Sequence, residues 1–170
     1  MDTGEVLADA FSRVRQLAER SVADLDTDAL AFRPEPEANS IGWLIWHLTR
    51  IQDDHVAEIA GMPQVWNTGN WATRFGMPAG TEETGYGHTT DQVAALRPGS
   101  PDLLVEYHAA VWKRTIEYLT TIDSDELNRI IDRSYDPPVA VGVRLVSVIS
   151  DNLQHAGQAL YVRGILQRSG

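Results

Sequence analysis

The stretch S-I-G-W-L-I-W-H-L-T-R-I-Q-D-D-H-V-A-E-I, residues 40–59, predicts a long amphipathic helix. Its apolar residues recur at intervals of three and four, the spacing that places side chains on one face of an α-helix. The residues on this face are Ile41, Leu44, Ile45, Leu48, Ile51, His55, Val56 and Ile59. Ser40 is a good N-cap, and Gly61 followed by Pro63 ends the helix.

Three other segments show the same periodicity and predict further long helices. They run from about Thr3 to Leu25, from Pro101 to about Ile122 and from about Val143 to Gln167. Ser100 and Pro101 suit the N-cap and the first position of the third long helix. No segment of strand length alternates convincingly between apolar and polar residues. We therefore expect an all-α fold, an antiparallel four-helix bundle, in a single domain over residues 1–170.

The connection between the second and third long helices, residues 61–100, is a long crossover rich in Gly, Thr, Trp and Pro. Connections of this length are usually functional or contain short helices of their own. The strings W-A-T-R-F, residues 71–75, and T-D-Q-V-A-A-L, residues 90–96, are typical of short helices. The segment before the last long helix contains a capped turn, S-D-E-L, and a Pro-Pro break.

The composition excludes several classes of function. The formal net charge is −10, with 14 Lys and Arg against 24 Asp and Glu, so a nucleic-acid partner and an anionic membrane surface are disfavoured. No apolar run is long enough to span a bilayer, and the acidic start of the chain does not resemble a signal peptide. Cysteine is absent, which removes disulfides and thiolate ligands and fits a cytoplasmic protein.

Histidine and carboxylate side chains are the remaining candidates for chemistry. The sequence contains no G-x-S-x-G, no phosphate-binding glycine loop and no H-E-x-x-H. His47 lies at the margin of the apolar face of its helix. On the last helix Asp151 and His155 lie one turn apart, again at the margin. Residues at i and i+4 can bind one metal ion between two helices, but they can equally form a surface ion pair.

The other polar candidates have both a structural and a functional interpretation. His55 falls within the apolar face, where a buried histidine with satisfied ring nitrogens is the usual outcome. His88 is a loop histidine or lines the site, and we expect His108 to be half-exposed and structural. Asp53 and Asp54 are expected to be charges on the outer face of their helix.

Two strings resemble the site-bearing helices of the DinB superfamily. N-S-I-G-W-L-I-W-H-L-T-R, residues 39–50, resembles the second helix of that family, in which a capped turn leads to a metal-binding histidine. D-N-L-Q-H-A-G-Q-A-L-Y-V-R-G, residues 151–164, resembles the fourth helix, in which an H-x3-H pair completes a three-histidine site. The actinobacterial members with V-W-H-L-x-R-x-Q-D-D-H are the most similar. The resemblance places metal ligands at His47, Asp151 and His155, with Asp151 where the family has histidine.

The resemblance implies a metal-dependent enzyme. Two histidines and one carboxylate suit one divalent ion, zinc or nickel, with manganese and iron as alternatives. Activities in the family include thiol S-transfer with mycothiol or bacillithiol and mycothiol-dependent maleylpyruvate isomerisation. A mycothiol-like S-transferase acting on a small molecule is thus the leading hypothesis, with a low-molecular-weight thiol as co-substrate. The alternatives are a non-catalytic stress-response or ligand-binding bundle with a degenerate site, and a metal-dependent hydrolase.

The sequence also suggests a substrate-binding arginine and a homodimer. Arg50, Arg144 or Arg163 could pair with a carboxylate on the substrate, and the sequence does not select among them. An exposed aromatic patch would support a homodimer.

Overall fold

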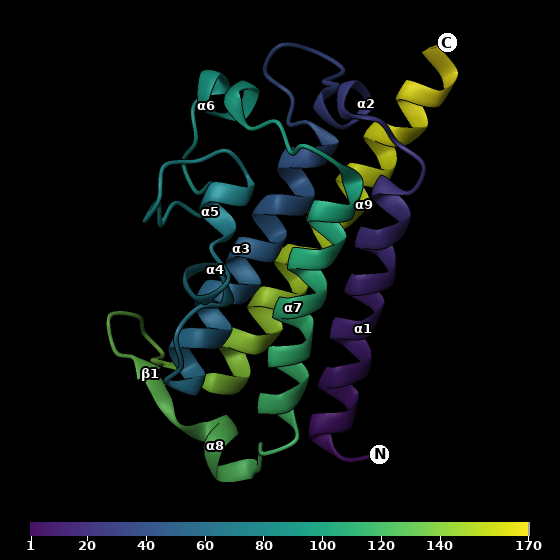
Figure 1. Cartoon of the computed structure of the whole chain (residues 1–170). Helices are drawn as coiled ribbons and strands as arrows, with labels where there is room; N and C mark the ends of the chain where they lie inside the picture. Colours follow the sequence, from purple (N-terminus) through teal and green to yellow (C-terminus); the bar gives the residue numbers. More distant parts are fainter. Residues whose placement is uncertain (170) are drawn as a thin grey trace.

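Four long helices form the body of the protein in the computed structural model, which describes residues 1–169 (Figure 1). They are α1 (Thr3–Val22), α3 (Ile41–Ala60), α7 (Pro101–Leu119) and α9 (Val141–Ser169). Helices α1 and α9 run in one direction, and α3 and α7 run in the opposite direction (Figure 1). The prediction of an all-α four-helix bundle is confirmed.

The starts of the long helices follow the predicted caps. Ser40 Oγ accepts a hydrogen bond from Trp43 N at 3.1 Å, and Ser100 Oγ accepts one from Leu103 N at 3.1 Å. Both bonds satisfy a backbone N–H group that the helix itself leaves free. At the other end of α3, Gly61 adopts the left-handed conformation with φ of 63°. The ends of α1, α7 and α9 differ by a few residues from the predicted ranges.

Helix α3 is the most enclosed of the long helices. It packs against both α7 and α9, and the crossover covers a further side (Figure 1). Its buried residues therefore include polar ones, among them His47, Arg50, Gln52 and Asp53. Because so many faces of α3 are covered, a single apolar stripe does not describe which of its residues lie inside.

Three short helices interrupt the crossover: α4 (Val65–Thr68), α5 (Trp71–Arg74) and α6 (Thr90–Ala95). The predicted helices at W-A-T-R-F and T-D-Q-V-A-A-L correspond to α5 and α6, whereas α4 was not predicted. Asp53 binds the start of α4: its carboxylate accepts hydrogen bonds from Val65 N at 2.8 Å and Trp66 N at 2.7 Å. The side of Asp53 expected to face solvent is thus covered by the crossover, and the prediction for Asp53 was wrong.

Arg50 holds a second part of the crossover. Its guanidinium is 0% exposed and donates to the carbonyl oxygens of Glu83 and Glu82, each at 3.1 Å. It also donates to the Tyr107 hydroxyl, which in turn donates to Asp53. Burial raises the pKa of Asp53 above its ordinary value, while these hydrogen bonds and the Arg50 charge oppose that shift. Through these bonds Arg50 and Asp53, both on α3, hold two parts of the crossover against the helix.

The remaining elements are α2 (Thr27–Ala31), α8 (Ser124–Asn128) and a hairpin of β1 (Ile130–Asp132) and β2 (Val139–Ala140). The capped turn predicted at S-D-E-L is α8. The hairpin corrects the expectation that strands are absent: Ile130 pairs with Ala140 in an antiparallel register. Strands this short show no detectable alternation. In the described part of the chain, no helix has the length and apolar character that crossing a membrane requires.

Candidate metal centre

His47, Asp151 and His155 come together between α3 and α9. One ligand atom from each residue lies within 4.8 Å of the others. The two imidazole rings are 4.8 Å apart, centroid to centroid, and meet edge to face at 76°. His155 Nε2 lies 3.5 Å from Asp151 Oδ1. Asp151 and His155 lie one turn apart on α9, and the packing of α3 against α9 brings His47 beside them.

The crossover fixes the orientation of the His47 ring. His47 Nδ1 lies 2.6 Å from the carbonyl oxygen of Thr84, which can only accept, so Nδ1 carries the proton. The lone pair is then on Nε2. Burial lowers the pKa of His47, and this favours the neutral ring, the form that binds a metal. A histidine held through its second nitrogen by a backbone carbonyl is the usual arrangement around a metal ion.

His155 is held in the same way by its own helix. His155 Nδ1 lies 2.8 Å from Gln158 Oε1, an acceptor, so Nδ1 donates there and Nε2 faces Asp151 Oδ1. The adjacent Asp151 carboxylate raises the pKa of His155. Both rings are thus held at Nδ1, and each offers a ligand atom beside the Asp151 carboxylate.

The unpaired atoms of the cluster suit a cation. Asp151 Oδ2 is buried, and no hydrogen-bond partner for it exists among the described residues. A buried carboxylate oxygen without a partner is costly unless a cation or a donor binds it. Tetrahedral zinc requires donors roughly 3.4 Å apart, a spacing calculated from metal–ligand bonds of about 2.0–2.1 Å. The 3.5 Å separation of His155 Nε2 and Asp151 Oδ1 is already close to this spacing. The three residues fit a divalent metal ion.

Aromatic rings from α3 surround His47. Trp43 stacks on His47 with ring centroids 4.6 Å apart, and Trp43 Nε1 donates to His88 Nδ1 at 3.2 Å. His88, in turn, stacks on Trp46 at 5.8 Å. Of its two proposed locations, His88 thus occupies the one beside the site, as a neighbour of the cluster that is not counted among its ligands.

Gly85 allows the crossover to approach His47 closely. A Cβ atom at this position would lie 2.8 Å from His47 Nδ1 and 2.9 Å from Trp46 Cζ3. Its φ of 91° is also one that residues with side chains rarely adopt. The string G-Y-G-H, too short to interpret as a phosphate loop, therefore packs directly on the candidate ligand.

Two other histidines differ from their predicted environments. His55 was expected in the core, but its side chain is 30% exposed and accepts from Arg144 Nη1 at 2.8 Å. Burial and the Arg144 charge lower the pKa of His55. His108 was expected to be half-exposed, but it is 1% exposed and neither ring nitrogen has a partner in the described part of the chain. Because α1 covers this face of α7, burial lowers the pKa of His108 to about 4.

Two pockets flank the cluster along α9. The first, of about 440 Å³, includes Asp151 and Arg144 in its lining. The second, of about 540 Å³, includes Gln158, the residue that holds His155, together with Leu44 and Tyr161. Asp151 lines the first pocket, so a bound ion would border it, whereas no residue of the cluster lines the second.

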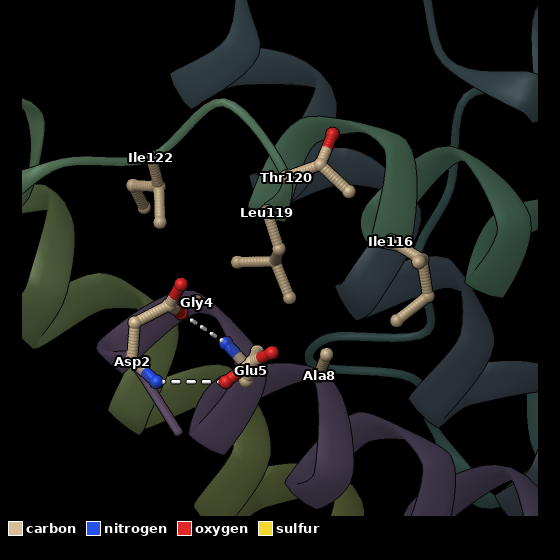
Figure 2. Close-up of a pocket in the computed structure, with 8 residues that line it drawn as sticks. All are labelled: Asp2, Gly4, Glu5, Ala8, Ile116, Leu119, Thr120 and Ile122. Carbon is tan, nitrogen blue, oxygen red and sulfur yellow. Dashed lines mark hydrogen bonds between the residues drawn. The ribbon is translucent and has the colours of Figure 1, made fainter.

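A further hollow lies far from the cluster, between the start of α1 and the end of α7 (Figure 2). Its acidic groups are already engaged: Asp2 N donates to Glu5 Oε2 and Glu5 N donates to Asp2 Oδ1, both at 2.8 Å (Figure 2). These bonds form the capping box of α1. The acidic groups of this hollow therefore stabilise the start of α1, and we do not assign it a ligand.

Comparison with known proteins assigns the family. Residues 10–159 match the sequence profile of the DinB superfamily, so the chain belongs to this superfamily. Among solved structures, the crystal structure of a conserved protein from Enterococcus faecalis is similar, with a TM-score of 0.88 and 30% sequence identity over 96% of each chain. No curated protein sequence matches significantly. The predicted resemblance is confirmed at the level of family and fold.

Proposed function

We propose that this protein is a metal-dependent thiol S-transferase that binds one divalent ion through His47, Asp151 and His155. The observation that carries the proposal is the pair of histidine rings held at Nδ1 beside a carboxylate. Thr84 O and Gln158 Oε1 each lie within hydrogen-bonding distance of a ring Nδ1, and the two rings and the Asp151 carboxylate each offer a ligand atom within 4.8 Å of the others. A surface ion pair would need neither constraint.

The chain itself orients and shields the site. Trp43 stacks on one face of His47, and the backbone at Gly85 covers its Nδ1 edge, so water reaches this ligand poorly. Asp151 and His155 are more exposed, with 37% and 19% of their side chains accessible. Substrates would therefore approach from the α9 side.

A bound divalent ion would supply Lewis acidity that lowers the pKa of a low-molecular-weight thiol at neutral pH. In the overall reaction a sulfur–carbon bond forms, the leaving group of the electrophile departs with its electron pair, and the thiol proton passes to solvent. The two pockets along α9 would take the two small-molecule substrates. With no cysteine in its sequence, the protein would depend on an external thiol. We expect it to act in the cytoplasm.

The test is conjugation of 1-chloro-2,4-dinitrobenzene by the zinc- or nickel-loaded protein, with and without mycothiol. We expect acceleration that requires the thiol and is lost in His47→Ala. Acceleration of ester hydrolysis without any thiol would instead identify a metal-dependent hydrolase. If neither reaction is accelerated although the metal is bound, the protein is a binding bundle and the transferase proposal is wrong.

A further inference from the structure

We propose that the pocket between Asp151 and Arg144 binds an electrophile that carries a carboxylate, and that Arg144 is the residue that recognises this carboxylate. The identity of the bound molecule as an electrophile rests on the proposed function. The binding of a carboxylate does not, because it can be measured without metal.

The pocket has one end at the metal cluster and an apolar wall. Asp151 belongs to both the cluster and the pocket lining. The apolar wall is formed by α3 and α9 through Ile51, Val143 and Val148. Tyr86 of the crossover and Tyr135 of the β1–β2 connection line it as well and are 90% and 64% exposed. Exposed tyrosines on connecting segments beside an apolar wall suit a small organic molecule.

Arg144 is the positively charged residue of this lining, and part of its guanidinium makes no hydrogen bond within the described chain. Its Nη1 donates to His55 Nδ1 at 2.8 Å and to Glu58 Oε2 at 3.3 Å. Its Nη2 lies 4.0 Å from Asp132 Oδ2, beyond hydrogen-bonding distance. Neither Nη2 nor Nε donates a hydrogen bond to any described residue. A guanidinium binds a carboxylate through two such parallel donors.

Glu58 and Asp132, the carboxylates closest to Arg144, do not block its access to a ligand in the pocket. Glu58 is 59% exposed and lies outside the pocket lining, as does Asp132. His55 accepts from Arg144 and is therefore neutral, with its proton on Nε2. These contacts hold the guanidinium in place at 17% exposure, so less side-chain entropy is lost when a ligand binds.

The other two arginine candidates are occupied elsewhere. Arg50 is fully buried in the bonds to the crossover. Arg163 donates to the carbonyl oxygens of Arg20, Ser21 and Ala23 at the end of α1. Arg144 alone among the three lines a pocket that reaches the cluster.

The spacing of the two pocket ends sets the size of the ligand. Arg144 and Asp151 lie seven residues apart on α9, which corresponds to two turns or ~10 Å of helix rise. A ligand that spans this distance has a carboxylate at one end, a reactive carbon at the other and a short apolar body between them.

The test is binding of 4-phenylbutanoate against its neutral analogue 4-phenylbutanamide, measured by calorimetry on metal-free and zinc-loaded protein. We expect the carboxylate to bind in both forms and the amide to bind about 10-fold more weakly, since the amide lacks the charge that strengthens these hydrogen bonds. Arg144→Gln should weaken carboxylate binding to the level of the amide, and Arg144→Lys should weaken it in part. Arg97→Gln removes the same charge from an exposed position and should have no effect.

Three results would overturn the proposal or part of the account around it. Equal binding of carboxylate and amide, or unchanged binding by Arg144→Gln, contradicts the role of Arg144. Carboxylate binding that requires zinc and ignores Arg144 means that the metal alone binds it. Arg144-dependent binding in a protein that takes up no metal would leave this inference standing and overturn the proposed function. If Arg144→Gln does not fold, the Nε resonance of Arg144 in the unaltered protein decides: it should shift with the carboxylate and not with the amide.

Discussion

Asp151 determines the character of the candidate metal centre. It replaces a neutral histidine donor of the family pattern with a carboxylate, which is harder and negatively charged. Its Oδ2 is buried and has no hydrogen-bond partner within residues 1–169, while its Oδ1 lies 3.5 Å from His155 Nε2. The carboxylate is therefore in place to coordinate rather than turned away from the cluster.

We expect Asp151→Ala to weaken zinc binding by well over tenfold, because loss of even an outer partner of a ligand costs about 10- to 100-fold. Asp151→His restores the family pattern and should retain zinc. Competition with a chromophoric chelator measures both affinities. Equal zinc affinity for Asp151→Ala and the unaltered protein would show that Asp151 does not coordinate.

His108 should make stability depend on pH. Its pKa in the folded protein is about 4, below the ordinary value of 6.5, so between these values the unfolded chain binds more protons. The free energy of unfolding therefore falls as the pH is lowered through this window, by on the order of 3 kcal/mol from this residue. His108→Leu should lose this part of the pH dependence.

Urea denaturation at pH 7 and pH 4.5 compares the two proteins. At pH 7 they should be similar in stability, because leucine has comparable volume and removes two ring nitrogens that no described residue hydrogen-bonds. His47 and His55, whose pKa values are also lowered, remain in both proteins and do not affect the comparison. The same loss of stability at pH 4.5 in both proteins would contradict the role assigned to His108.

At the scale of elements, the crossover belongs to the site because Thr84 contacts His47. Two residues of α3 hold the crossover in this position: Arg50 bonds to residues 82 and 83, and Asp53 bonds to the start of α4. Asp53 uses both carboxylate oxygens: Oδ1 accepts from Val65 N, and Oδ2 accepts from Trp66 N and Tyr107 Oη. Asp53→Asn would place an amide N–H₂ group against one of these donors. We expect the free energy of unfolding to fall by about 2–3 kcal/mol in thermal or urea denaturation.

The neighbouring Asp54→Asn provides the matched control for this change. Asp54 is 40% exposed and its Oδ1 accepts from Gln64 Nε2, a bond that an asparagine oxygen can also accept. Its effect should stay below about 1 kcal/mol. Similar effects for both substitutions would mean that Asp53 does not hold α4.

The loop at residues 84–88 should control metal affinity through Gly85. Gly85→Ala would drive a methyl group into His47 and Trp46, so we expect zinc affinity to fall by about 10-fold or more. Gly87→Ala suffers a similar backbone strain, with φ of 73°, but its Cβ would meet nothing within 4 Å. The difference between the two variants in a chelator competition isolates the contact with His47. If they bind zinc equally, the loop does not position the ligand.

The long helices could be predicted from sequence because they depend on local signals, whereas the three cluster residues were predicted as a set from the resemblance to the DinB superfamily. Periodicity and caps define α1, α3, α7 and α9, and the spacing of Asp151 and His155 places both on one helix face. The partners of His47 could not be predicted, because Thr84 and Gly85 reach it from a crossover without periodicity. His108 and Asp53 were placed wrongly for the same reason: the pattern of one helix does not reveal which other elements cover it.

At the scale of the whole molecule, α9 combines several roles. One face carries Asp151 and His155, another packs against α1 and α3, and a third exposes Val143, Val146, Leu153 and Tyr161. A homodimer remains a prediction. The ligands of the metal cluster come from α3 and α9, so the cluster forms only when the bundle packs these two helices side by side.

Metal content tests the central claim most directly. We expect protein purified without an affinity tag to contain about one divalent ion per chain by elemental mass spectrometry. His47→Ala and His155→Ala should each lose this ion, whereas His55→Ala, which alters a histidine outside the cluster, should keep it. Equally low metal content in the unaltered protein and in both ligand variants, or full retention of metal by His47→Ala, would contradict the account.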